Sequence, residues 1–377
     1  MISLTRSKRC CGTMNSLRVR QEEALYQRLH DFFGGTVVAL ILQNVAEPHD
    51  QLIREQLVQD GCVPVEAGRW PSVQEALIGT RDRLEFQAPM ELMWNPDSET
   101  PARAVPSSTS EAYNFIVLSP AVFDMDAEQL RFVLGHEIGH ILFRHQVMRW
   151  IFDVVYPQRV SVPPYLRNEY DLWTKCAEFS SDRAGAHAAG SIDAATSVIS
   201  RLRTESRPTT AERIACLKNP SQIDKLVREL EPQPRSDFDR LAVAFMTAAG
   251  ELLSRADGEL SAVERAHLLN RVSRYGYAGR LAQALADTSG ATAVRDADEI
   301  TVVARRAADE LRSHYSEHLD EIFLNLAIIV VRDGTVTDEE YQLLSYFGGS
   351  LLGIAETRQT QLILRVFRSE FFNPLEE

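Results

Sequence analysis

The clearest pattern of hydrophobic and polar positions covers residues 129–145, where apolar residues return at the period of an α-helix. The apolar positions that share one helical face are Leu130, Val133, Leu134, Ile138, Ile141 and Leu142. Asp126 and Gln129 form a predicted capping box at the start, because each side chain can bond to the other residue's backbone amide. The pattern therefore predicts a half-buried amphipathic helix.

A second pattern predicts a β-strand over residues 113–119, which are rich in aromatic and β-branched side chains. Such a strand can lie at the edge of a sheet, with one side of its backbone open, or inside the sheet as part of the core. The pattern leaves both alternatives open. Residues 17–33 and 49–59 predict helices, and residues 37–43 predict a buried strand. We find no chemical motif in residues 1–80 and expect this segment to pack against the next domain.

The pattern changes near residue 231. Residues 231–237 contain two prolines within three positions and predict a short, stiff linker. Beyond it the periodicity is helical almost throughout, as in residues 238–255 and 298–331. We therefore predict an N-terminal segment (1–80), an α+β domain (81–230), a linker (231–237) and an all-helical domain (238–377).

The helical half contains an internal repeat. Asp257-Gly-Glu-Leu-Ser-Ala-Val-Glu264 matches Asp333-Gly-Thr-Val-Thr-Asp-Glu-Glu340, at an offset of 76 residues. Each copy follows an apolar helix, turns at Asp-Gly and restarts with a predicted capping box, Ser261 with Glu264 and Thr337 with Glu340. An EF-hand does not fit, because the loops lack its alternating oxygen ligands.

Candidate chemistry lies on the amphipathic helix, where residues 136–140 read His-Glu-Ile-Gly-His. Two histidines four residues apart project from one helical face and can bind a single zinc ion. Glu137 lies beside that face and can take a proton from the water that the metal activates. A surface helix with two unrelated histidines is the alternative, but the apolar surroundings favour a zinc site. His145 points away from this face and is not a predicted ligand.

A third protein ligand is expected, because catalytic zinc usually has three and one open position. Glu178 is the best candidate, and Asp182 shares its helical face four residues later. Two carboxylates at that spacing are tolerable if Glu178 binds zinc and Asp182 accepts a hydrogen bond from a ligand histidine. A solvated acidic face is the alternative, although the small apolar neighbours suit a buried helix better. His187 is interpreted as a surface or packing residue and Cys176 as a small buried one.

Three blocks of this chain, in order, resemble the zinc metalloendopeptidases typified by HtpX and the CAAX prenyl protease. The first block is Ile116-Val-Leu-Ser-Pro120 together with the amphipathic helix that carries the His-Glu-Ile-Gly-His motif. The other two are Glu178-x-x-x-Asp182-Arg183 and Arg207-Pro-Thr-Thr-Ala-Glu-Arg-Ile-Ala-Cys-Leu217. The resemblance covers about residues 80–220 and implies a zincin-like domain that cleaves proteins or peptides. Arg207 stands where the family usually has histidine, and the membrane spans of the best-known members are missing.

The same resemblance makes Arg213 a catalytic candidate, because it matches a family arginine. It could hold Asp182 or a substrate carbonyl; an ordinary helix-surface arginine, downstream of a cap formed by Thr209 and Glu212, is the alternative. The repeated helix–Asp-Gly–helix pattern resembles the tellurite-resistance TerB-like domain. In that family acidic residues are suspected metal contacts, so Asp257 and Asp333 are candidate metal sites, with caps and turns as the competing interpretation.

Composition narrows the function further. A net charge of −13 argues against general nucleic-acid binding. No apolar run approaches the roughly 18–20 residues that cross a bilayer, so we expect no integral membrane segment. Five scattered cysteines indicate a reducing, cytoplasmic location without a disulfide framework.

The sequence thus predicts a mostly helical α+β protein with a zincin-like metallopeptidase domain and an all-α TerB-like domain. His136, His140 and Glu178 would hold one Zn²⁺ per chain, and Glu137 would act as general base in endopeptidase catalysis. The helical domain would regulate or target the enzyme through a protein partner. The alternative function is a catalytically silent, zinc-stabilised scaffold that acts through its TerB-like domain.

Overall fold

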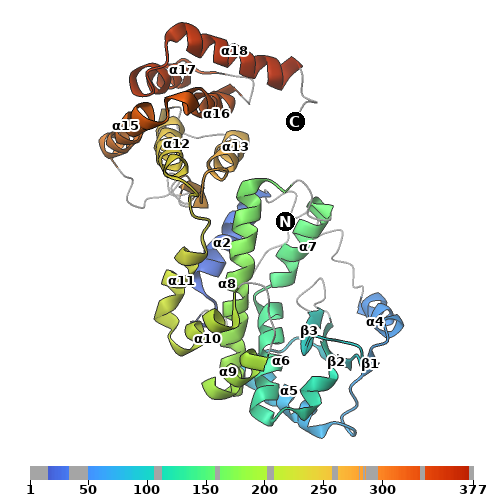
Figure 1. Cartoon of the computed structure of the whole chain (residues 1–377). Helices are drawn as coiled ribbons and strands as arrows, with labels where there is room; N and C mark the ends of the chain where they lie inside the picture. The colour runs from blue at the N-terminus through green and yellow to red at the C-terminus, as the bar shows by residue number, and fades with distance from the viewer. Residues whose placement is uncertain are drawn as a thin grey trace. The chain divides into compact units, whose positions relative to one another are not determined.

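The computed structural model describes residues 16–33, 50–105, 113–157, 162–201, 208–256, 262–279, 281–282, 285, 296–331 and 336–372 (Figure 1). The chain divides into two compact units. The first contains residues 1–161 and 170–230, and the second contains residues 162–169 and 231–377. The predicted linker is non-helical up to residue 236, and α12 begins at Asp237. Residues 162–169, which we had placed in the α+β domain, group with the second unit. That each unit folds independently stays a prediction.

A four-stranded sheet of order β1-β2-β4-β3 forms one side of the first unit. Its strands are β1 (Val63–Pro64), β2 (Met90–Trp94), β3 (Ala102–Val105) and β4 (Asn114–Leu118). β4 pairs in parallel with β2 and antiparallel with β3, and all five of its residues are buried. The predicted strand at 113–119 is therefore internal. The edge of the sheet nearest the helix that carries the histidine motif is β3. Mixed pairing and a mostly helical remainder make the unit α+β.

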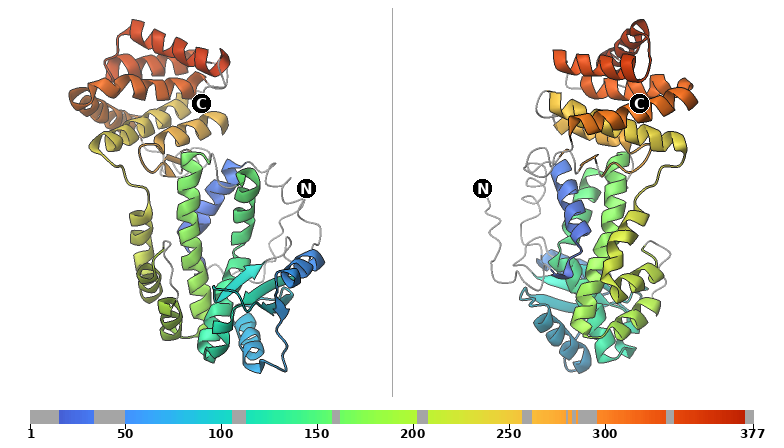
Figure 2. Two further views of the ribbon diagram at one scale, coloured as in Figure 1. Left: turned by 45° about the vertical axis from the view of Figure 1, so that its right-hand side comes forward. Right: turned by 90° about the vertical axis from the view of Figure 1, so that its left-hand side faces the viewer.

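Helices cover this sheet and build the rest of the first unit, except that the start of α8, up to residue 169, groups with the second unit (Figure 2). They are α2 (Arg20–Phe32), α4 (Asp50–Gln59), α5 (Pro71–Arg83), α6 (Ala127–Leu142), α7 (His145–Val155), α8 (Pro164–Ala189), α9 (Ile192–Arg201), α10 (Thr210–Lys218) and α11 (Ile223–Leu230). α6 packs against α5, α9 and β3, and its apolar face joins the main core through Leu130, Leu134 and Ile138. The predicted strand at 37–43 lies outside the described residues.

The second unit is helical in its described part. Its helices are α12 (Asp237–Ala256), α13 (Ala262–Val272), α15 (Ala297–His314), α16 (Leu319–Val331), α17 (Asp338–Ser345) and α18 (Glu356–Phe372). The first helix of each copy packs on a later helix, α12 on α15 and α16 on α18. The second helix of each copy contacts the first helix of the other copy, α13 on α16 and α17 on α12. These reciprocal contacts follow the internal repeat, because α12–α13 and α16–α17 carry its two copies.

Candidate metal centre

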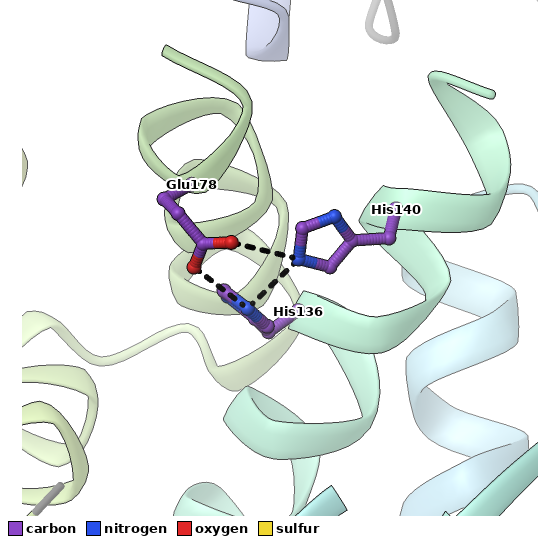
Figure 3. Close-up of side chains that lie close together, drawn as sticks. All are labelled: His136, His140 and Glu178. Atoms are coloured by element: carbon purple, nitrogen blue, oxygen red, sulfur yellow. Dashed lines mark hydrogen bonds and ion pairs between the residues drawn. The ribbon is translucent and has the colours of Figure 1, made fainter. Parts of the chain in front are cut away.

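The two histidines of the motif lie on α6 and face α8 (Figure 3). The predicted capping box is present: the Asp126 side chain accepts from the backbone amides of Glu128 and Gln129, and the Gln129 side chain accepts from the Asp126 amide. This cap and the buried apolar face fix where the helix begins and how it is rotated. His136 and His140 consequently point the same way, with their Nε2 atoms 3.1 Å apart.

Small residues allow α8 to approach this face of α6 closely. A Cβ atom on Gly139 would lie 2.9 Å from the Ala184 Cβ and 3.1 Å from the Ser181 Cα, and a Cβ on Gly135 would lie 2.6 Å from the Ala188 Cβ. Larger side chains at these glycines would push the helices apart, since such distances are below van der Waals contact. The close approach brings the acidic residues of α8 to the histidines of α6.

Glu178 of α8 completes a group of three potential ligands. Its Oε2 lies 3.6 Å from the His136 Nε2, and its Oε1 lies 3.6 Å from the His140 Nε2. Ligand atoms about 2.05 Å from a tetrahedral zinc ion lie about 3.3 Å from one another, so these separations fit zinc. Within the described part of the chain, His136, His140 and Glu178 form the group whose spacing suits a metal ion.

Asp182 lies behind His136 and is held there by Arg213 of α10. The Asp182 Oδ1 is 3.0 Å from the His136 Nδ1, and the Arg213 Nε and Nη2 donate to the two carboxylate oxygens at 2.7 and 2.6 Å. Burial alone would raise the pKa of Asp182, but Arg213 and His136 outweigh it and lower that pKa. Because the side chain of Arg213 is only 5% exposed, it is not an ordinary helix-surface arginine.

The carboxylate of Glu137 is buried and bonded to the sheet edge. Its Oε2 accepts a hydrogen bond of 2.7 Å from the backbone amide of Ala104 in β3. Burial raises the pKa of this carboxyl group, although the nearby His136 and the Ala104 amide act in the opposite direction. The edge strand of the sheet thus fixes the orientation of the carboxylate next to the histidine pair.

Sequence reasoning missed the contacts of three residues near the site. Arg149 of α7 lies 3.6 Å from the Glu178 Oε1, on the side of the carboxylate that faces His140. His145 is fully buried, with its Nδ1 2.8 Å from the Nδ1 of His140. Glu22 of α2 lies 3.5 Å from the His145 Nε2, so a residue of the N-terminal segment, in which we found no chemical motif, lies near the site. No motif joins residues 22 and 145 in sequence, and only the fold brings them together.

The remaining candidates stay away from this group or beyond the described residues. His187 is exposed, as expected, and Cys176 is buried. The Thr209–Glu212 and Thr337–Glu340 capping boxes are present. Arg207, Asp257, Asp333 and Ser261 fall outside the residues that the structure describes. Among the helices of the described ranges, none is long and apolar enough to cross a membrane.

Comparison with known proteins adds one match. Residues 104–162 match the model of peptidase family M48, over a stretch that contains β4, α6 and α7 with His136, Glu137 and His140. No curated protein and no solved structure matches the chain. The match and the His-His-Glu geometry support a metallopeptidase. Glu178, Asp182 and Arg213 lie beyond the matched stretch, and their placement at the site comes from the structure.

Proposed function

We propose that this protein is a zinc-dependent endopeptidase in which His136, His140 and Glu178 hold one zinc ion. The observation that carries the proposal is the convergence of three ligand atoms beside a buried carboxylate, Glu137, that is not part of the ligand group. A purely structural zinc site uses four protein ligands and leaves no position open. Three ligands and an adjacent carboxylate are typical of hydrolytic sites.

A zinc ion held here would supply a Lewis acid that activates water and polarises the scissile carbonyl. Glu137 takes the proton of the attacking water and passes it to the leaving amine nitrogen. The Asp182 Oδ1 lies 3.0 Å from the His136 Nδ1, and a carboxylate at this position favours a proton on Nδ1 and a free lone pair on Nε2. Arg213 donates to Asp182 through Nε and Nη2, and its Nη2 also lies 3.8 Å from the Glu178 Oε2; we assign it positioning in place of substrate contact.

The substrate would be a protein or peptide that lies extended along β3. This strand pairs with β4 on one side, and its other side approaches α6, where Ala104 bonds to Glu137. An extended chain added to a sheet edge gains backbone hydrogen bonds without requiring a particular sequence. We also propose that the enzyme is related to the HtpX and CAAX prenyl protease type of metallopeptidase and that it is located in the cytoplasm.

We further propose that the second unit is a TerB-like domain that recruits substrates or restrains the enzyme through a protein partner. The support is the duplicated pattern in sequence, together with the reciprocal packing of α13 on α16 and α17 on α12. Deleting this domain at residue 230 should change which proteins are cut or how fast. Unchanged targets and rates in a soluble truncated protein would remove this role.

The decisive variant is Glu137→Gln, because it removes the base and keeps the shape of the side chain. We expect zinc content to stay at one per chain while hydrolysis of an unfolded protein falls by about 10²-fold or more. Glu128→Gln is the matched control: it makes the same change at an exposed position of the same helix and should leave activity intact. Equal cleavage by wild type and Glu137→Gln would exclude this role for Glu137. If wild type and Glu137→Gln both bound zinc and a screen found no protein that either of them cleaves, the result would favour the alternative of a catalytically silent scaffold.

The ligand set is tested by zinc content. His136→Ala, His140→Ala and Glu178→Ala should each reduce zinc occupancy far below one per chain. Asp182→Ala should weaken binding less, because Asp182 contacts the metal only through His136. Full occupancy in Glu178→Ala combined with loss in Asp182→Ala would reverse the assignment of the third ligand.

A further inference from the structure

The ring of His140 has a second polar contact, on the side away from Glu178. Its Nδ1 lies 2.8 Å from the Nδ1 of His145, the first residue of α7. The side chain of His145 is fully buried, and its other ring nitrogen, Nε2, lies 3.5 Å from the Glu22 Oε1. A line of polar groups therefore leads from the candidate ligand through α7 to α2.

The carboxylate of Glu22 is fully buried and fixed from several directions. Arg18 donates to both of its oxygens through Nε and Nη2 at 2.7 Å, and the Ser180 hydroxyl of α8 donates to Oε2 at 3.1 Å. The indole of Trp173 donates to Oε1 at 3.4 Å. Burial raises the pKa of Glu22, but Arg18 and His145 outweigh it and lower that pKa to about 2, so the group is charged at neutral pH.

The directions of the protons follow from these partners. A ligand histidine presents a bare Nε2 to a metal, so His140 would carry its proton on Nδ1. The neighbouring Nδ1 of His145 must then be the acceptor, which leaves the proton of a neutral His145 on Nε2. That nitrogen lies 3.5 Å from the Glu22 Oε1, so the proton is near a negative charge. In this arrangement the donors and acceptors alternate along the line, from the His140 Nδ1 to the carboxylate of Glu22.

We propose that His145 and Glu22 are positioning residues for the metal centre. Together they hold His140 in the tautomer and ring orientation that direct its Nε2 at the metal. The inference rests on the proposed metal centre and extends it to α2, which lies more than 100 residues before the histidine motif. Asp182 positions His136 in a comparable way. Each candidate histidine ligand is thus linked to a buried carboxylate, His136 to Asp182 directly and His140 to Glu22 through His145.

Zinc affinity and the cobalt spectrum, both independent of peptidase activity, test the role of His145. His145→Leu removes the acceptor and should weaken zinc binding by about 10–100-fold, as for other partners of ligand histidines. It should also change the visible absorption of the cobalt-substituted protein. His145→Asn keeps an acceptor near the position of Nδ1 and should recover part of the affinity. Met148→Ala, also fully buried in α7, is the control for packing damage and should keep wild-type affinity.

Histidine-selective ¹⁵N NMR of the zinc-loaded wild-type protein tests the same arrangement without altering the site. The His145→Asn protein serves only to assign the His145 signal. We expect His145 as the neutral Nε2–H tautomer; a proton on its Nδ1 would overturn the inference. So would a His145→Leu protein with wild-type zinc affinity and cobalt spectrum, or an equal loss in Met148→Ala. A wild-type protein that bound no zinc would overturn the metal centre itself, and the inference with it.

Discussion

Several buried polar groups of the two units are bonded in different ways. In the first unit, charged side chains bond across the fold: Ser180 reaches Glu22 over 158 positions, and Arg213 reaches Asp182 over 31. In the second unit, buried Glu340 closes a capping box with Thr337, three positions earlier, and buried Gln359 donates to the backbone carbonyl of Ile354. The second unit also has a longer-range group, Tyr275 with Glu321 and Asn325, in which only Glu321 is charged.

This difference indicates where the chain gives up stability for function. Burying an ion pair gains little or nothing over apolar packing, because the desolvation of two charges offsets their attraction. Polar groups that close helix ends, by contrast, satisfy backbone amides that would otherwise lack a partner. Charged clusters such as Asp182–Arg213 and Glu22–Arg18 therefore need another reason to exist. Their positions supply one, because Asp182 lies beside His136 and Glu22 lies beside His145, which contacts His140.

Breaking the Asp182–Arg213 pair should have the largest combined effect on stability and zinc affinity. Arg213→Met keeps the bulk of the side chain but leaves the Asp182 carboxylate buried without its partner. We expect a loss of about 3–5 kcal/mol in the free energy of unfolding of the metal-free protein. Zinc affinity should fall by about 10–100-fold as well, because His136 loses its oriented acceptor. Chemical denaturation and competition with a chelating dye measure the two effects.

Phe323→Ala is the counterpart in the second unit. Phe323 is fully buried in α16, and truncating such a ring costs about 3–5 kcal/mol. The expected loss of stability matches that of Arg213→Met, but zinc affinity should not change. If Phe323→Ala weakened zinc binding equally, the metal site would depend on global stability and the contrast between the units would not hold.

The Glu22 cluster should give the first unit a dependence of stability on acid. The folded protein lowers the pKa of Glu22 from 4.5 to about 2, so the folded state favours its charged form. The associated stability, about 3 kcal/mol, is present above pH 4.5 and is lost as the pH falls toward 2. In the metal-free Glu22→Gln protein, the free energy of unfolding should therefore decrease less between pH 5 and pH 3 than in wild type.

Glu23→Gln, which removes a charge from an exposed neighbouring position of α2, is the matched control for that measurement. Parallel pH curves for wild type and Glu22→Gln would show that the cluster does not hold Glu22 in its charged form.

Two glycines allow a matched test of close packing. Alanine at Gly139 would place its Cβ 2.9 Å from the Ala184 Cβ, and alanine at Gly348 would place its Cβ 2.5 Å from the Phe323 Cε2. Each substitution should lower stability by about 1–3 kcal/mol through overpacking. Gly139→Ala should also reduce zinc affinity, because it pushes Glu178 on α8 away from α6. Gly348→Ala should not, and an equal effect on zinc would contradict the comparison.

The sequence predicted the local features of the site well. The amphipathic helix, its capping box and the histidine pair depend on residues within about four positions of one another, and helical geometry relates such residues directly. The strand at 113–119 is also present as β4. Its internal place in the sheet was not predictable, because the neighbouring β3 is short and its Ala-Arg-Ala-Val sequence carries no clear strand pattern.

What the sequence could not show are the contacts that the tertiary fold creates. Glu22, His145 and Arg149 have no motif, and each is an ordinary helix residue until α2, α7 and α8 pack together. Glu178 and Asp182 could be nominated from their spacing, but their approach to α6 depends on small residues on two helices. A buried polar partner is a property of the folded neighbourhood, and single-sequence periodicity contains no information on it.

The smallest expected effects come from the two helix caps. Asp126 begins α6 and Thr337 begins α17, and each side chain accepts hydrogen bonds from backbone amides of the first turn. Asp126→Ala and Thr337→Ala should each cost about 1 kcal/mol, because one or two amides lose their partner. Neither should change zinc affinity more than about twofold. Asp126 lies ten residues before the first histidine of α6, and packing against α5 and α9 holds this helix in place without the cap. A tenfold loss of affinity in Asp126→Ala would mean that local capping also positions the ligands. The site would then depend on its own helix end as much as on the buried carboxylates behind it.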